Sequence, residues 1–210
     1  MDPEEVLFPC NGIILEGVLA FPQGEDFFAM VIVCHPHPLY GGDMNNNVVN
    51  AVCQKVGEEG LAWLKFNFRG VGRSGGHFGG GIDEREDAKA ALAFAQAQGK
   101  IDPERIGICG YSFGSLVAFA VAVEDQRIRA VAGISPFIQP ADLLIRYARP
   151  KLFICGTHDE YINAKSLEQL VLTLPEPKEL TIYPGVDHFW WGDEEKVAER
   201  VGQFFAKYFL

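Results

Sequence analysis

The most informative stretch of this chain is Gly110-Tyr111-Ser112-Phe113-Gly114. An apolar run at 105–109 precedes it and is typical of a buried strand, and the apolar run at 115–123 is typical of a buried helix. A G-x-S-x-G turn between strand and helix holds the serine in a strained conformation, with its hydroxyl above the sheet. The flanking glycines let the two elements approach closely. We interpret Ser112 as a candidate nucleophile, against the alternative of a tight glycine-rich turn without chemistry.

The composition of the 210 residues excludes several classes of protein. A net charge of −10 argues against a nucleic-acid surface, which would be basic. No apolar run reaches the roughly 18 residues that a membrane span needs, and the acidic start at 1–5 lacks the basic region of a signal peptide. We therefore expect a single domain over residues 1–210, in the cytoplasm, with neither nucleic acid nor membrane as a partner. A homodimer is left open.

The cysteines point to packing rather than to chemistry. Their number, five, is odd and no C-x-x-C occurs, so the sequence suggests neither a disulfide framework nor a zinc site. Three of them lie in apolar, strand-like runs and are expected to be buried small hydrophobes. No cofactor or metal is expected.

Strand and helix patterns alternate along the chain, which predicts an α/β fold with a mostly parallel eight-stranded sheet and helices on both faces. The helix that begins at Asp83 is expected to have a capping box, with Glu86 three residues later, and to end at Gly99. The predicted strands are a hairpin over 6–21 that turns at Asn11-Gly12, then 29–34, 61–68, 105–109, 128–134, 152–155 and 179–183; the other predicted helices cover 48–56, 115–123, 164–172 and 197–208.

Two loops after later strands carry an acid and a base. Asp159 follows the strand at 152–155, and His188 follows the strand at 179–183. In an open α/β sheet, functional residues gather at the carboxyl ends of strands, so these two side chains are expected beside Ser112. The imidazole would take the serine proton, and the carboxylate would fix the imidazole tautomer. Asp187 and His158 are the rivals, and a turn role for Asp159 is the simpler alternative.

The loop at 35–46 follows the early central strand and is the expected source of a second oxyanion donor, beside the N–H of Phe113. Its two prolines have no N–H to donate. We therefore predict Leu39 or Tyr40 as the donor, with His37 third.

Two further patterns invite other chemistry. His35 and His37 have the spacing of metal ligands, but neighbouring side chains on an extended segment point apart and no carboxylate cluster completes a site. Residues 70–75 match G-x-G-x-x-G, yet more glycines follow at 79–81 before a helix begins. A dinucleotide site needs that helix at once. We interpret this stretch as a glycine-rich loop that crosses the top of the sheet near the active site.

These motifs together resemble the α/β-hydrolase superfamily over nearly the whole chain. More narrowly, His35-Pro36-His37-Pro38, Gly41-Gly42 and the run at 66–74 are similar to a group of small bacterial α/β-hydrolases, related to dienelactone hydrolases and to prolyl-oligopeptidase-like domains.

The resemblance implies serine-esterase chemistry on carboxylic esters, with Ser112, Asp159 and His188 as the matching positions. Dienelactone hydrolases proper use cysteine as the nucleophile, and serine at 112 departs from that pattern. The predicted function is a serine carboxylesterase that acts through an acyl-serine intermediate, with a small-molecule ester as its partner. The alternatives are a serine peptidase, a thioesterase, or a non-catalytic scaffold of the same fold used for binding.

Many members of this superfamily have a helical lid after the sixth strand, but only residues 136–150 separate the two strands here. We expect no substantial lid, an open and shallow site, and short-chain or soluble esters. Candidate pocket residues are Tyr40, Phe113, Phe137, Ile138, Tyr161, Phe189, Trp190 and Trp191.

Overall fold

The computed structural model describes residues 1–24, 27–140 and 142–210, and its strands and helices alternate as the sequence predicts. The strands are β1 (Glu4–Cys10), β2 (Ile13–Ala20), β3 (Phe28–Cys34), β4 (Ala62–Phe66), β5 (Ile101–Tyr111), β6 (Ala130–Ile134), β7 (Lys151–Gly156) and β8 (Lys178–Tyr183). The helices are α1 (Asn47–Glu58), α2 (Asp83–Ala97), α3 (Phe113–Glu124), α4 (Ala164–Thr173) and α5 (Glu194–Phe209), with a short 3₁₀ turn at Pro38–Tyr40.

The strands form one eight-stranded sheet in the order β1-β2-β4-β3-β5-β6-β7-β8. β2 pairs antiparallel with β1 and with β4, and every later pair from β4-β3 to β7-β8 is parallel. Parallel neighbours need crossover connections, and the intervening helices supply them. The predicted mostly parallel sheet is confirmed.

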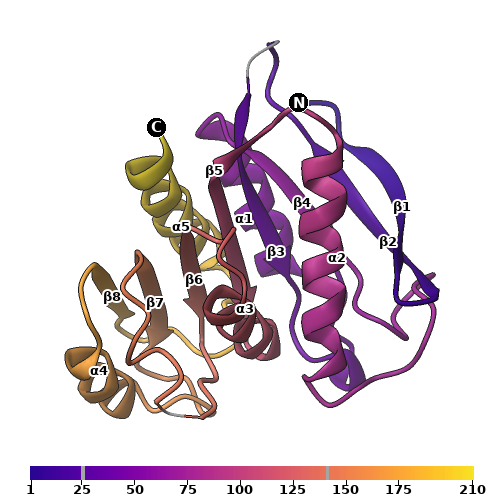
Figure 1. Ribbon diagram of the computed structural model, residues 1–210. Helices are drawn as coiled ribbons and strands as arrows, with labels where there is room; N and C mark the ends of the chain where they lie inside the picture. The colour runs from indigo at the N-terminus through magenta and orange to yellow at the C-terminus, as the bar shows by residue number, and fades with distance from the viewer. Residues whose placement is uncertain (25–26, 141) are drawn as a thin grey trace.

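Helices cover both faces of this sheet. The buried residues of α1 and α5 pack with one face, whereas those of α2, α3 and α4 pack with the other. In Figure 1, α2 and α3 lie in front of the sheet, and α1 and α5 lie behind it. The central strands β3 and β5 are therefore buried on both sides, which explains their continuous apolar runs.

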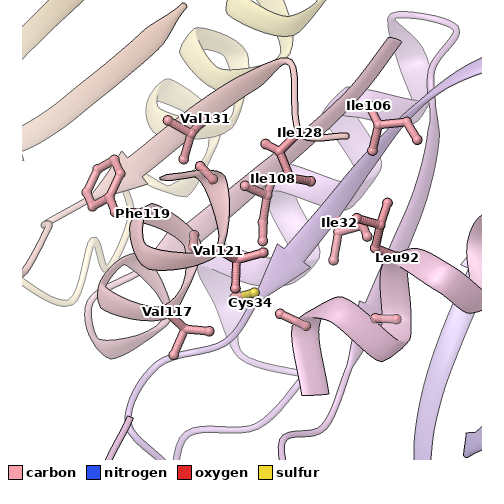
Figure 2. Close-up of a cluster of buried hydrophobic side chains, with 14 of the residues drawn as sticks. Ile32, Cys34, Leu92, Ile106, Ile108, Val117, Phe119, Val121, Ile128 and Val131 are labelled. Atoms are coloured by element: carbon pink, nitrogen blue, oxygen red, sulfur yellow. The ribbon is translucent and has the colours of Figure 1, made fainter. Parts of the chain in front are cut away.

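Figure 2 shows the core between β3, β5 and β6 and the helices α2 and α3. Ile32 and Ile108 point from adjacent strands toward Leu92, Val117 and Val121 of the helices, and all five are fully buried. Burying such a side chain contributes about 1.5–3 kcal/mol. This packing fixes α3, and with it the turn that carries Ser112.

Local turns follow the sequence in one case and depart from it in another. Asn11 and Gly12 both have positive φ, 44° and 88°, as the predicted two-residue hairpin turn requires. The predicted capping box at Asp83 and Glu86 is wrong, because Ile82 occupies the cap position and makes no side-chain cap. Instead, the carboxylate of Glu84 accepts hydrogen bonds from the amides of residues 79 and 81, both at 2.7 Å. It thereby joins the start of α2 to the glycine-rich loop.

The segment between β6 and β7 contains turns but no helix or strand in its described residues, 135–140 and 142–150. The amide of Phe137 donates to the hydroxyl of Ser115 at 2.9 Å, which ties this segment to the first turn of α3. The expectation that no substantial lid covers the site is confirmed. Among the described helices, none combines the length and the apolarity that crossing a bilayer requires.

Candidate active site

Ser112 lies in a sharp turn between β5 and α3, with φ 54° and ψ −118°. Positive φ is costly for a non-glycine residue. A Cβ on Gly110 would lie 2.2 Å from the carbonyl oxygen of Gly114, and one on Gly114 would lie 2.3 Å from that of Cys34. The two glycines are therefore required by close backbone contacts, and they let the serine hydroxyl stand at the carboxyl end of the sheet.

His188 and Asp159 lie beside this serine. The Nε2 atom of His188 is 3.0 Å from the Oγ of Ser112, and its Nδ1 is 2.9 and 3.0 Å from the two carboxylate oxygens of Asp159. All three residues are buried. Three predicted site residues, 29 to 76 positions apart in the chain, are thus joined by one row of hydrogen bonds.

The carboxylate of Asp159 is held in its ionised form. Its Oδ1 accepts hydrogen bonds from the amides of Tyr161 at 3.0 Å and Ile162 at 2.9 Å. Burial alone would raise the pKa of Asp159, but hydrogen bonds from His188, Ser135 and the Ile162 amide outweigh it and hold the pKa below its usual value. An ionised acceptor suits an Nδ1–H donor, which leaves the Nε2 lone pair of the imidazole facing the serine.

The two alternative residues, Asp187 and His158, lie outside this row of hydrogen bonds. The carboxylate of Asp187 accepts from the amides of residues 189 and 190, at 2.9 and 3.0 Å, and so shapes the loop after His188. The side chain of His158 is exposed. The hydroxyl of Tyr111 donates to the carbonyl of His188 at 2.7 Å and fixes the backbone of the imidazole-bearing residue.

The role of Ser135 was not predicted from the sequence, and the predicted pocket role of Trp190 is wrong. Trp190 is fully buried behind the site instead of lining a pocket, and its Nε1–H donates to the hydroxyl of Ser135 at 3.0 Å. Both residues have positive φ, 44° and 60°. No residue type in the sequence signals such a conformation, because glycine or asparagine would be the usual sign.

His35 supports the loop structurally. Its Nδ1 is 2.6 Å from the carbonyl of Pro36, and its Nε2 accepts the amide of Phe68 at 3.0 Å. Burial lowers the pKa of His35 to about 4, so the ring is neutral. Because both ring nitrogens are engaged, His35 has no lone pair left for a metal ion.

The structure does not support Leu39 or Tyr40 as oxyanion donors. The amide of Leu39 donates to the Nδ1 of His37 at 3.2 Å, and that of Tyr40 donates to the His37 carbonyl at 3.1 Å. The short 3₁₀ turn folds both amides back on the loop, and both side chains are exposed. The amides of His37 and Phe113 have no acceptor among the described residues.

A cavity of about 820 Å³ lies over Ser112 and is open on one side. Its volume falls in the usual range for small-molecule pockets, so the site is more spacious than the shallow one expected from the sequence. Five of the predicted pocket residues line the cavity: Tyr40, Phe113, Phe137, Tyr161 and Phe189. The other three do not: Ile138, Trp190 and Trp191.

The stretch at 70–75 packs on the β1–β2 hairpin through Arg73 and Glu16. Only Phe78 and Gly80 of the glycine-rich loop reach the cavity.

Comparisons with known proteins identify the family of this chain. A model of the dienelactone hydrolase family matches residues 82–207. An uncharacterized protein of Rickettsia prowazekii is 31% identical over 188 residues, which cover 83% of this chain and 77% of that protein. The chain spans less than two thirds of several other curated relatives.

Solved structures show the same architecture. An alpha-beta serine hydrolase homologue from Coxiella burnetii superposes with a TM-score of 0.87, at 31% identity over 97% of both chains. An α/β serine hydrolase without a lid from Xanthomonas campestris superposes with a TM-score of 0.84, at 24% identity over 100% of this chain and 96% of the other. The family model matches more than half of the residues of this chain. The chain therefore belongs to the dienelactone hydrolase family, a family of hydrolases with the α/β-hydrolase fold.

Proposed function

We propose that this protein is a serine carboxylesterase, with Ser112 as nucleophile, His188 as general base and acid, and Asp159 as the group that orients the imidazole. The observation that carries the proposal is the row of hydrogen bonds from carboxylate to imidazole to hydroxyl, at 2.9 and 3.0 Å, at the base of an open cavity. Geometry of this kind, rather than the fold alone, specifies function.

In the acylation step, the Oγ of Ser112 attacks the ester carbonyl carbon while its proton moves to the Nε2 of His188. The tetrahedral intermediate then collapses, the bond to the alcohol oxygen breaks, and that oxygen takes the proton from Nε2. In the second step, water attacks the acyl carbon and gives a proton to Nε2. The bond from that carbon to Oγ then breaks, Oγ takes the proton back from Nε2, and the carboxylic acid leaves. The ionised Asp159 stabilises the imidazolium in both steps.

The negative charge on the carbonyl oxygen needs donors that are not already engaged. We propose the amides of Phe113 and His37 for this role, because they border the cavity and have no acceptor among the described residues. Phe113 opens α3, so the positive end of the helix dipole adds to its donor strength. A crystal structure of the phosphonylated enzyme tests this: a phosphoryl oxygen should lie within about 3 Å of both nitrogens. Contacts with the amides of Leu39 and Tyr40 instead would reject it.

A fluorophosphonate probe tests the nucleophile directly. The native chain should be labelled and Ser112→Ala should not, while both fold alike by circular dichroism. Equal labelling of the two proteins would show that Ser112 is not the nucleophile, and no labelling of either would favour a binding scaffold. Parallel assays with peptide, thioester and oxygen-ester substrates separate the esterase from its peptidase and thioesterase alternatives.

A further inference from the structure

The cavity has a wall of aromatic rings directly beside the imidazole. The ring of Tyr161 lies 4.7 Å from that of His188, and the ring of Phe189 lies 5.7 Å from it, measured between centroids. The two aromatic rings are 6.3 Å apart and nearly perpendicular, at 88°. Both side chains line the cavity, yet they are 60% and 49% exposed. Their exposed faces are therefore available to a ligand that enters the cavity.

The backbone holds this wall in place before any ligand binds. The amide of Tyr161 donates to the same Asp159 carboxylate oxygen that faces the imidazole, and the amide of Phe189 donates to Asp187. A preorganised surface loses less conformational entropy when a ligand binds. The backbone of Tyr161 is thus held by the carboxylate that orients the His188 imidazole, and the backbone of Phe189 is held by the neighbouring Asp187.

The chemistry of the reaction says which part of a substrate meets this wall. His188 must return its proton to the alcohol oxygen, so the alcohol part leaves past the imidazole. A group attached to that oxygen would lie against Tyr161 and Phe189. A flat aromatic ring can make edge-to-face or offset contacts there, which an aliphatic group of equal size cannot.

The described lining of the cavity also contains no formally charged side chain. None of its described lining residues is Lys, Arg, Asp or Glu, and burial lowers the pKa of His37, which keeps that imidazole neutral near pH 7. The other polar side chains of the lining, such as Asn46 and Gln139, are neutral amides or hydroxyls. A carboxylate on the substrate would lose its hydration without gaining a counterion.

We propose that Tyr161 and Phe189 form a leaving-group subsite that selects neutral esters of aromatic alcohols. The proposal rests on the proposed esterase function and adds the substrate class to it.

Three butyrate esters test the subsite: benzyl, cyclohexylmethyl and ethyl butyrate, whose alcohols have similar acidity. The native enzyme should show a kcat/KM for the benzyl ester about 5-fold or more above that for the cyclohexylmethyl ester. Equal values would overturn the aromatic selection. A carboxylate in the para position of the benzyl ring should lower kcat/KM about 10-fold or more, and no decrease would overturn the selection for neutral esters.

Variants of Tyr161 and Phe189 test whether the preference for the benzyl ester arises at these two rings. In Tyr161→Ala and Phe189→Ala the benzyl to cyclohexylmethyl ratio should fall toward one, whereas Tyr161→Phe keeps the ring and should keep the ratio. A ratio does not depend on how much of each variant is folded. Trp191→Ala is the matched control, because Trp191 is 72% exposed near Phe189 in sequence but does not line the cavity. An unchanged ratio in both alanine variants would reject the subsite.

The two proposals fail in different ways. If Ser112 reacts with the fluorophosphonate and ethyl butyrate is hydrolysed, but the ratio is flat, only the subsite is wrong. If Ser112 does not react and no ester is hydrolysed, the esterase proposal itself is wrong.

Discussion

The indole Nε1–H of Trp190 donates a hydrogen bond to the hydroxyl of Ser135 across 3.0 Å, and this buried contact joins the loop of His188 to the tip of β6. Both partners have a left-handed backbone that non-glycine residues rarely adopt. Ser135 in turn hydrogen bonds to Asp159 and lowers the pKa of that carboxyl. The contact thus connects the fully buried indole to the acid of the candidate triad.

Trp190→Phe should remove this donor and leave a cavity, because the larger indole is fully buried. Losing one partner of a buried hydrogen bond costs about 1–3 kcal/mol, so the free energy of unfolding should fall by at least that amount in urea titrations. Trp191→Phe, an exposed neighbour, is the control and should change it by less than about 0.5 kcal/mol. Equal effects of the two substitutions would show that the hydrogen bond contributes nothing.

The assignment of the acid predicts unequal effects of two similar substitutions. Asp159→Asn replaces the partner of the His188 Nδ1–H and should lower kcat about 10⁴-fold. Asp187→Asn keeps that contact, and its amide oxygen can still accept from the backbone of residues 189 and 190, so kcat should fall far less. Steady-state kinetics on one ester decide the matter, and the reverse order would make Asp187 the acid.

The sequence was sufficient for the parts of the site that follow from chain order. Ser112, Asp159 and His188 each follow a strand, and the carboxyl ends of parallel strands meet at one edge, so their proximity could be predicted. The hydrogen bonds made by the amides of Leu39 and Tyr40 could not be predicted, because the 3₁₀ turn at 38–40 redirects both and nothing in its composition announces this. The strained backbone of Ser135 and Trp190 could not be predicted either.

The same limit applied at the start of α2. The Asp83 and Glu86 pair has the spacing of a capping box, yet Glu84 makes the decisive contacts because the preceding glycine loop folds over it. Tertiary structure, which local spacing does not encode, determined which carboxylate was used.

The described cysteines are all buried thiols, which gives a prediction about alkaline pH. Burial raises the pKa of Cys53 to about 12, and burial also raises the pKa values of Cys34 and Cys109. The folded protein therefore keeps protons that the unfolded chain releases near pH 9. Stability is fully present below that pH and is lost as the pH rises above it, by up to about 1.4 kcal/mol per pH unit for each such thiol.

Urea titrations under reducing conditions from pH 8 to 10.5 would measure this loss. Lys151 acts in the opposite direction, because burial lowers its pKa to about 8 and deprotonation then favours the folded state. Burial also lowers the pKa of Lys65, but it raises the pKa of all five thiols, which outnumber the two lysines, so the free energy of unfolding should decrease. Cys53→Ala should show a shallower decrease than the native chain, and parallel curves for the two proteins would contradict the prediction.

The strained backbone of Ser112 predicts a trade-off, in which a substitution that relieves the strain raises stability and abolishes activity. Alanine is ordinarily better than glycine by about 0.5–1 kcal/mol within regular structure. At residue 112 the order should reverse, because φ is 54° and a left-handed conformation costs a non-glycine residue about 1–3 kcal/mol. Ser112→Gly and Ser112→Ala should both lose ester hydrolysis, with the glycine variant the more stable in urea unfolding. If the alanine variant is more stable by the ordinary margin, the turn stores no strain and the serine is held there at no cost.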